Sequence, residues 1–177
     1  IYNMSLMAGI VSRMGEAVAE EWAAGVVNNF ARTPQSNDTG QIRAVASGEC
    51  QIAIANTYYL ARLAASDEPA DQAVASAVNI VFPGQESNGT HVNISGAGLV
   101  STSPNPENAV KFLEYLSSDA AQLLFANGNN EYPAVPGIAA SSVVVGLGEF
   151  KEDMLNASEL GINQAAAIMV FDRAGWK

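Results

Sequence analysis

The chain has 177 residues, 49% of them hydrophobic and 15% charged, so it can bury a proper core and is too apolar for a disordered protein. Its 18 acidic and 8 basic side chains give a formal net charge of −10, which argues against nucleic acid or an anionic membrane surface as a partner. A single cysteine, Cys50, rules out an internal disulfide, and no apolar run reaches the roughly 18 residues of a membrane helix.

The first elements predicted along the chain are helices. Residues 4–14 and 16–30 have helical periodicity, and Gly15 separates them. Asp38 is a suitable N-cap for a shorter helix that Gly48 would end. One face across the first two helices is expected to be apolar and consists of Met14, Val18, Trp22, Val26 and Phe30.

Extended segments follow, separated by further helices. Residues 50–55 are an apolar run typical of a buried strand, 78–82 are a second run, and 91–100 are extended around a glycine pair. Later helices are predicted after the N-cap Asn105, with Val110, Leu113 and Leu116 buried, and over residues 118–127 and 162–174. This order predicts an α/β fold with its ligand site at the carboxyl ends of the strands.

Two adjacent tyrosines mark the end of the first predicted strand. Tyr58 and Tyr59 follow the polar pair Asn56-Thr57, where a new helix is expected to begin. Neighbouring side chains in a strand point to opposite faces, so both phenols can reach one ligand only where the backbone changes direction. A small trivalent cation can displace the phenolic proton, whose pKa is about 10, and bind the hard oxygen. The pair therefore suggests ferric iron, while ordinary aromatic packing is the alternative.

Several long motifs occur in the order found in one known family. They include Asn29-Phe30-Ala31-Arg32, Gln41-Ile42-Arg43-Ala44-Val45-Ala46, Gly48-Glu49-Cys50, Ala55-Asn56, Tyr58-Tyr59, Gly89-Thr90-His91-Val92-Asn93-Ile94-Ser95-Gly96-Ala97-Gly98 and Asp172-Arg173-Ala174-Gly175-Trp176. These motifs span nearly the whole chain and resemble periplasmic ferric-iron-binding proteins, which deliver Fe3+ to importers of the ATP-binding-cassette type. The chain resembles their carboxy-terminal portion.

The resemblance implies a metal site made of tyrosines. Tyr58 and Tyr59 match the family's adjacent pair of iron ligands, and Tyr2, which precedes Asn3 and a helix, matches a third. The three phenols are expected to converge on one cleft. A synergistic anion such as carbonate is expected with Fe3+, and Arg32 and Asn37 lie in a polar loop that could hold it or could cap a helix.

The resemblance also implies a two-lobed fold of the type 2 periplasmic-binding class. Residues 1–95 are expected to belong to the second lobe, and residues 96–177 to the hinge crossing and the carboxy-terminal helical segment of the first lobe. No secretion signal is seen before Ile1, and we expect the amino-terminal lobe to be missing. The expected compartment is the periplasm, the expected partner is an ABC permease, and the surface left by the missing lobe favours a homo-oligomer.

Other functions remain open at this stage. A binding protein for another small ligand, such as an anion or a polyamine, and a ligand-free, self-associating remnant are the main alternatives. Cys50, His91 and Asn93 could form a thiol-hydrolase triad, but a small thiol at the start of an apolar strand is usually buried, and the chain is not expected to be an enzyme. His91, the only histidine, is expected to have a structural role near a hinge.

Overall fold

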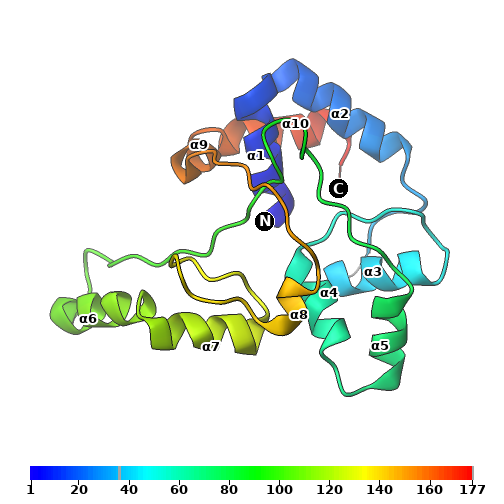
Figure 1. Cartoon of the computed structure of the whole chain (residues 1–177). Coiled ribbons are helices and arrows are strands. Elements are labelled where there is room, and N and C mark those ends of the chain that lie inside the picture. The colour runs from blue at the N-terminus through cyan, green and yellow to red at the C-terminus, as the bar shows by residue number, and fades with distance from the viewer. Residues whose placement is uncertain (36, 177) are drawn as a thin grey trace. The chain divides into compact units, whose positions relative to one another are not determined.

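The computed structural model describes residues 1–35 and 37–176, whose regular elements are helices (Figure 1). The helices are α1 (Tyr2–Met14), α2 (Glu16–Asn28), α3 (Asp38–Ala46), α4 (Thr57–Ala64), α5 (Pro69–Ser76), α6 (Pro106–Leu116), α7 (Asp119–Asn129), α8 (Ser142–Val145), α9 (Ala157–Ile162) and α10 (Gln164–Ala174). None of these helices is long and apolar enough to cross a membrane.

The chain divides into two compact units. The first contains Ile1–Pro34, Val81–Ser95 and Phe150–Lys177, and the second contains Gln35–Ile80 and Gly96–Glu149. Helices α1, α2, α9 and α10 therefore belong to the first unit, and α3 to α8 belong to the second. The predicted assignment of residues 1–95 and 96–177 to different lobes stays a prediction.

The first unit packs around small side chains. Its core consists of Met7, Ala8, Val11, Ala19, Ala23, Ala167 and Val170. The apolar face predicted across α1 and α2 is partly at the surface, since Met14 and Val18 are 59% and 42% exposed, and the buried residues of α2 are Ala19 and Ala23. Alanine lets α2 approach α10 closely, so the larger side chains are left at the edge of the contact.

Aromatic side chains close one end of the first unit. The rings of Trp22 and Trp176 stack with their centroids 6.0 Å apart, and Phe30 meets Trp176 edge-on at 5.5 Å. Gly175 adopts the left-handed conformation that ends α10, with φ 71°, as the sequence predicts. This turn brings Trp176 back onto Phe171, and the two ring centroids lie 5.0 Å apart.

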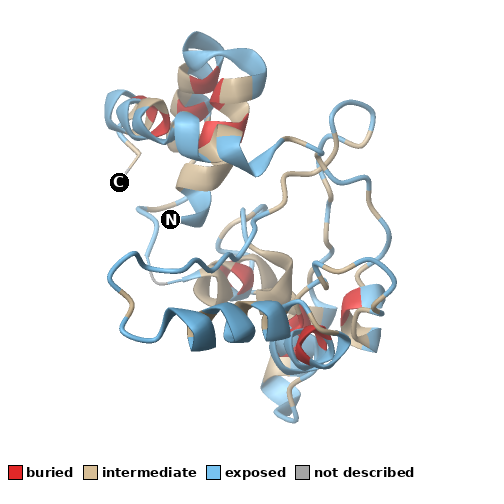
Figure 2. Ribbon diagram, turned by 90° about the vertical axis from the view of Figure 1, so that its left-hand side faces the viewer, coloured by how far each residue is buried: buried red, intermediate tan, exposed pale blue. Residues whose placement is uncertain are grey.

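The second unit buries fewer large side chains. Figure 2 shows the buried residues in red, and in this unit the apolar ones, all in helices, are Ile42, Ala44, Ala61, Leu63, Ala121, Ala126 and Val144. Helix α6 begins at Pro106, as predicted, but it contains no buried residue. The predicted buried stripe is therefore wrong, since Leu113 and Leu116 are only partly covered and Val110 is 41% exposed.

The segments predicted as strands form no ladder in the described part of the chain. Residues 50–55, 78–82 and 91–100 are irregular, and the isolated parallel bridge seen among the described residues joins Thr90, just before the last of these segments, to Glu152. In this bridge the Thr90 N–H donates to Lys151 O at 2.8 Å, and the Asp153 N–H donates to Thr90 O at 2.8 Å. A strand needs a hydrogen-bonded neighbour as well as an apolar sequence, and these runs have none among the described residues.

Candidate metal centre

Tyr58 and Tyr59 lie side by side in the first turn of α4. Their ring centroids are 4.3 Å apart and the ring planes are tilted by 32°. Helix α4 begins at Thr57, directly after an extended Asn56, so the chain changes direction just before the pair, as predicted. The Tyr59 N–H donates to the Asn56 carbonyl at 3.3 Å. The bend therefore places two adjacent phenols on one side of the chain, which a continuous strand would not do.

A cation lies over both tyrosine rings. The guanidinium carbon of Arg62 is 5.7 Å from the Tyr58 centroid and 5.5 Å from the Tyr59 centroid. Arg62 is four residues after Tyr58 and three after Tyr59, which are the spacings that bring side chains together on a helix. Both distances are within the range of a cation–π interaction. The sequence analysis missed this residue, although its helical spacing was a usable signal.

A carboxylate connects the start of α3 to the start of α4. Asp38 Oδ2 accepts hydrogen bonds from the backbone N–H of Asn56 at 2.8 Å and from its side-chain amide at 2.9 Å. The sequence suggested Asp38 as the N-cap of α3, but the cap is Asn37, whose Oδ1 accepts from the Gly40 N–H at 3.1 Å. The carboxylate of Asp38 is therefore turned toward the segment that carries the tyrosines.

The other predicted site residues are distributed over both units. Tyr2 is the first residue of α1, is 42% exposed and belongs to the first unit. Its convergence with the tyrosine pair of the second unit stays a prediction. Arg32 lies in the first unit, where its Nη1 donates to the Thr33 carbonyl at 3.4 Å, and Asn37 lies in the second.

Two further tyrosines lie elsewhere in the second unit. Tyr115 is in α6 and is 47% exposed. Tyr132 follows α7, and burial raises the pKa of its phenol, which disfavours the phenolate form that a metal requires. Across the described residues, no group of three or more histidine, cysteine, aspartate and glutamate side chains is arranged to hold a metal ion. The adjacent phenols of Tyr58 and Tyr59 are the candidate ligands that the structure brings together.

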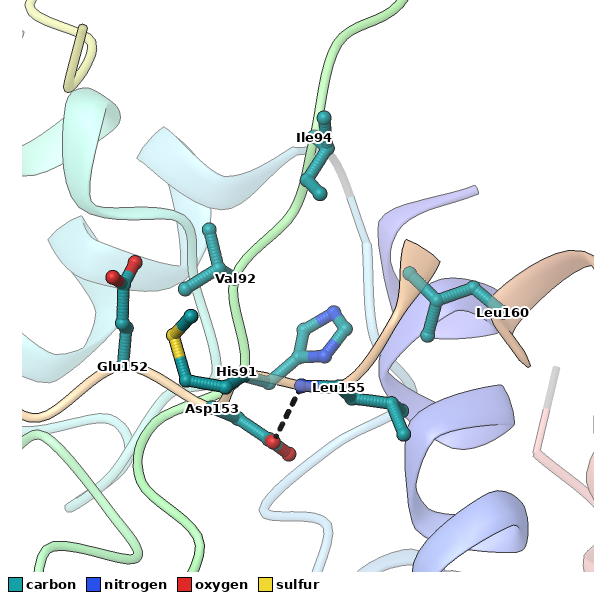
Figure 3. Close-up of a pocket in the computed structure, with 8 residues that line it drawn as sticks. His91, Val92, Ile94, Glu152, Asp153, Leu155 and Leu160 are labelled. Carbon is teal, nitrogen blue, oxygen red and sulfur yellow. Dashed lines mark hydrogen bonds between the residues drawn. The ribbon is translucent and has the colours of Figure 1, made fainter. Parts of the chain in front are cut away.

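His91 lines a small pocket in the first unit, of about 180 Å³. Figure 3 shows its imidazole among the side chains of Ile94, Leu155 and Leu160. Its Nε2 lies 3.1 Å from Asn93 Oδ1. Burial lowers the pKa of His91, and the Asn93 hydrogen bond and the charge of Asp153 oppose that shift. This environment fits the structural histidine that the sequence suggests.

Comparison with known proteins identifies the family. A family model described as "Bacterial extracellular solute-binding protein" matches residues 9–154. The chain belongs to this family. The named relatives described next are proteins of iron uptake and iron binding.

The relatives of this solute-binding protein include iron uptake protein A1 of Synechocystis sp., which is 49% identical over 176 residues. That match covers 99% of this chain and 49% of the relative. The major ferric iron-binding protein of Neisseria meningitidis serogroup B is 26% identical over 171 residues, covering 97% of this chain and 50% of the relative. The chain thus spans about half the length of the curated relatives it matches.

Solved structures show the same relationship. A Trichodesmium protein in complex with iron and citrate ligands is 54% identical, with a TM-score of 0.94 over 99% of this chain and 56% of the other. The ferric binding protein from Campylobacter jejuni is 36% identical, with a TM-score of 0.95 and the same two coverages. The fold is therefore part of a type 2 periplasmic-binding fold, the α/β class that the sequence predicts.

Proposed function

We propose that this chain binds ferric iron through the phenolate oxygens of Tyr58 and Tyr59, as part of a protein that delivers Fe3+ to an ABC-type importer. The observation that carries the proposal is the close packing of the two rings, whose centroids lie 4.3 Å apart, at the start of α4. A ferric ion favours hard anionic oxygen ligands. Two phenols that are already adjacent without the metal reduce the entropy cost of binding it. The printed names of the relatives concern iron uptake and ferric iron binding, which supports the same cargo.

Tyr2 is the proposed third ligand. Its support is the family resemblance of Tyr2-Asn3 at the start of a helix, together with its 42% exposed side chain. Three phenolates leave an iron coordination sphere open, so water or an anion such as carbonate would complete it. Arg32 and Asn37 are the proposed anion donors, and the hydrogen bond from Gly40 to Asn37 supports the alternative in which this loop only caps α3.

The proposed setting is the periplasm, with the permease of an iron importer as partner and no enzymatic activity. The support is membership of a family of bacterial extracellular solute-binding proteins. Self-association is a further proposal, supported by large apolar side chains that remain exposed in the second unit, such as Phe112 at 60% and Leu124 at 66%. A different cargo, an anion or a polyamine, is the main competing function.

The experiment is a titration of the purified chain with Fe(III)-citrate, followed by visible absorption. Phenolate bound to ferric iron gives a charge-transfer band, so we expect colour that saturates with added iron and fades at acidic pH, where protons compete for the phenolates. Putrescine and phosphate, titrated separately by calorimetry, probe the competing cargoes. A saturating heat with either of them, and no visible band with iron, would replace the ferric proposal.

A further inference from the structure

The segment before the tyrosine pair is fixed by one side chain from another helix. Asp38 and Asn56 are 18 residues apart, and both are partly buried. One carboxylate oxygen, Oδ2, receives both the backbone N–H and the side-chain amide of Asn56, at 2.8 and 2.9 Å. Hydrogen bonds to a charged acceptor are stronger than hydrogen bonds between neutral groups.

Asn56 connects the Asp38 hydrogen bonds to the two tyrosines. It is the residue before α4, and its carbonyl accepts the N–H of Tyr59 at 3.3 Å. The orientation of the Asn56 peptide therefore sets the direction in which the first turn of α4 leaves. That turn contains both phenols. A change in this peptide would move both phenols, because the two residues are consecutive and their rings are in contact.

Asp38 is itself held on an anchored helix. The Asn37 cap closes the first turn of α3, and Arg43 at the other end of that helix pairs with Asp71 of α5. Asp71 also accepts from Ser66 Oγ at 2.9 Å, just after α4. Both ends of α3 therefore interact with residues that flank α4. The Asp38 carboxylate makes the interaction next to the two phenols.

We propose that Asp38 is a positioning residue for the metal site, acting through Asn56 to hold Tyr58 and Tyr59 in the arrangement that binds ferric iron. The inference rests on the proposed function, since it names what orients the ligands of that site. It assigns Asp38 no contact with the ion. The hydrogen bonds, rather than the negative charge alone, carry the effect.

Four variants separate hydrogen bonding from charge. Asp38→Ala removes both bonds, whereas Asp38→Asn keeps an oxygen that can accept them and removes the charge. Asn56→Ala removes the side-chain amide bond to Asp38 and keeps the backbone donor. Asp119→Asn, at an exposed position of α7 in the same unit, makes the same charge change away from the site. Far-UV circular dichroism first establishes that each variant is folded.

The readouts are the affinity for Fe(III) and the wavelength of the phenolate-to-iron band. We expect Asp38→Ala to weaken iron binding about tenfold or more and to shift the band, which corresponds to losing roughly 1.4 kcal/mol of ligand positioning. Asp38→Asn should recover most of the affinity, Asn56→Ala should be intermediate, and Asp119→Asn should match the parent. If Asp38→Ala does not fold, Asn56→Ala decides the matter by the same two readouts.

The outcomes distinguish this inference from the proposed function. A parent chain without any charge-transfer band overturns the ferric site itself. A parent with the band, and Asp38→Ala and Asn56→Ala variants with the same affinity and wavelength, overturns the positioning role and leaves the ferric site standing. Equal losses in Asp38→Asn and Asp119→Asn also overturn it, because charge alone would then explain the effect.

Discussion

The guanidinium of Arg62 lies over the ring of Tyr58, with its central carbon 5.7 Å from the ring centroid. The same carbon is 5.5 Å from the Tyr59 centroid, so one cation contacts two aromatic faces. This contact holds a positive charge next to the proposed ligands before any metal is bound.

Arg62→Gln should destabilise the second unit modestly. A cation–π contact at an exposed site contributes about 0.5–1 kcal/mol, and Arg62 is exposed, so we expect a loss of that size in urea unfolding. Lys111→Gln, an exposed position of α6, is the matched control and should change nothing measurable. Equal stability of the two variants would mean that the cation–π contact of Arg62 with Tyr58 does not contribute to the free energy of unfolding.

Gly89→Ala should be strongly destabilising. Gly89 has φ +99°, and a Cβ there would lie 2.5 Å from the Glu152 carbonyl oxygen, next to the Thr90–Glu152 bridge. Gly48→Ala is the control, because Gly48 has φ +78° but no atom within 4 Å of the added carbon. We expect about 1–2 kcal/mol for the control, from backbone conformation alone, and clearly more for Gly89→Ala. Equal losses in urea unfolding would argue against the close approach of these segments.

His91 should make the free energy of unfolding depend on pH below about 6.5. Burial lowers its pKa below the ordinary value of 6.5, so at mildly acidic pH the unfolded chain binds a proton that the folded chain does not. The contribution of the neutral imidazole is thus complete above pH 6.5 and declines as the pH falls toward the lowered pKa. Urea midpoints of the parent should fall over this range.

The variant His91→Gln removes the only histidine and should flatten that part of the pH profile. Carboxylates titrate mainly at lower pH, so the difference between parent and variant isolates the imidazole. A parent profile that is already flat, or a variant that keeps the same slope, would contradict the burial of His91.

Self-association should depend on the exposed apolar side chains of α6 and α7. Phe112→Ser combined with Leu124→Ser removes two large exposed groups from the second unit, and sedimentation velocity should show a shift from dimer or larger species toward monomer. Val81→Ser, at an 82% exposed position of the first unit, is the control and should leave the distribution as in the parent. A parent that sediments as a monomer at high concentration would remove the basis of this prediction.

Helix ends were predictable where a local residue decides them. Gly15 separates α1 from α2, Pro106 begins α6 and Gly175 ends α10, and each acts through its own backbone conformation. The strands were not, because residues 50–55 and 78–82 have strand-like sequences but no pairing partner among the described residues. A strand forms only when two segments pair through backbone hydrogen bonds, and the sequence of one segment does not specify its partner.

The candidate metal site was also predictable only in its local features. The adjacency of Tyr58 and Tyr59 at a change of backbone direction is readable from the sequence, and helical spacing would also have pointed to Arg62. The hydrogen bonds from Asn56 to Asp38 were not readable, because 18 residues separate them and the contact depends on how α3 packs near α4. The burial of the alanines in α2 was missed for a related reason, since close helix packing selects small apolar side chains over larger ones.

The ferric site is tested most directly by comparing two double variants in the Fe(III)-citrate titration. Tyr58→Phe with Tyr59→Phe keeps both rings and removes both oxygens, whereas Tyr115→Phe with Tyr132→Phe makes the same chemical change outside the pair. We expect the visible band to disappear in the first variant and to keep its affinity in the second, with the first still folded by circular dichroism. A Tyr58→Phe, Tyr59→Phe variant that is as coloured as the parent would contradict the assignment of this pair as the iron ligands.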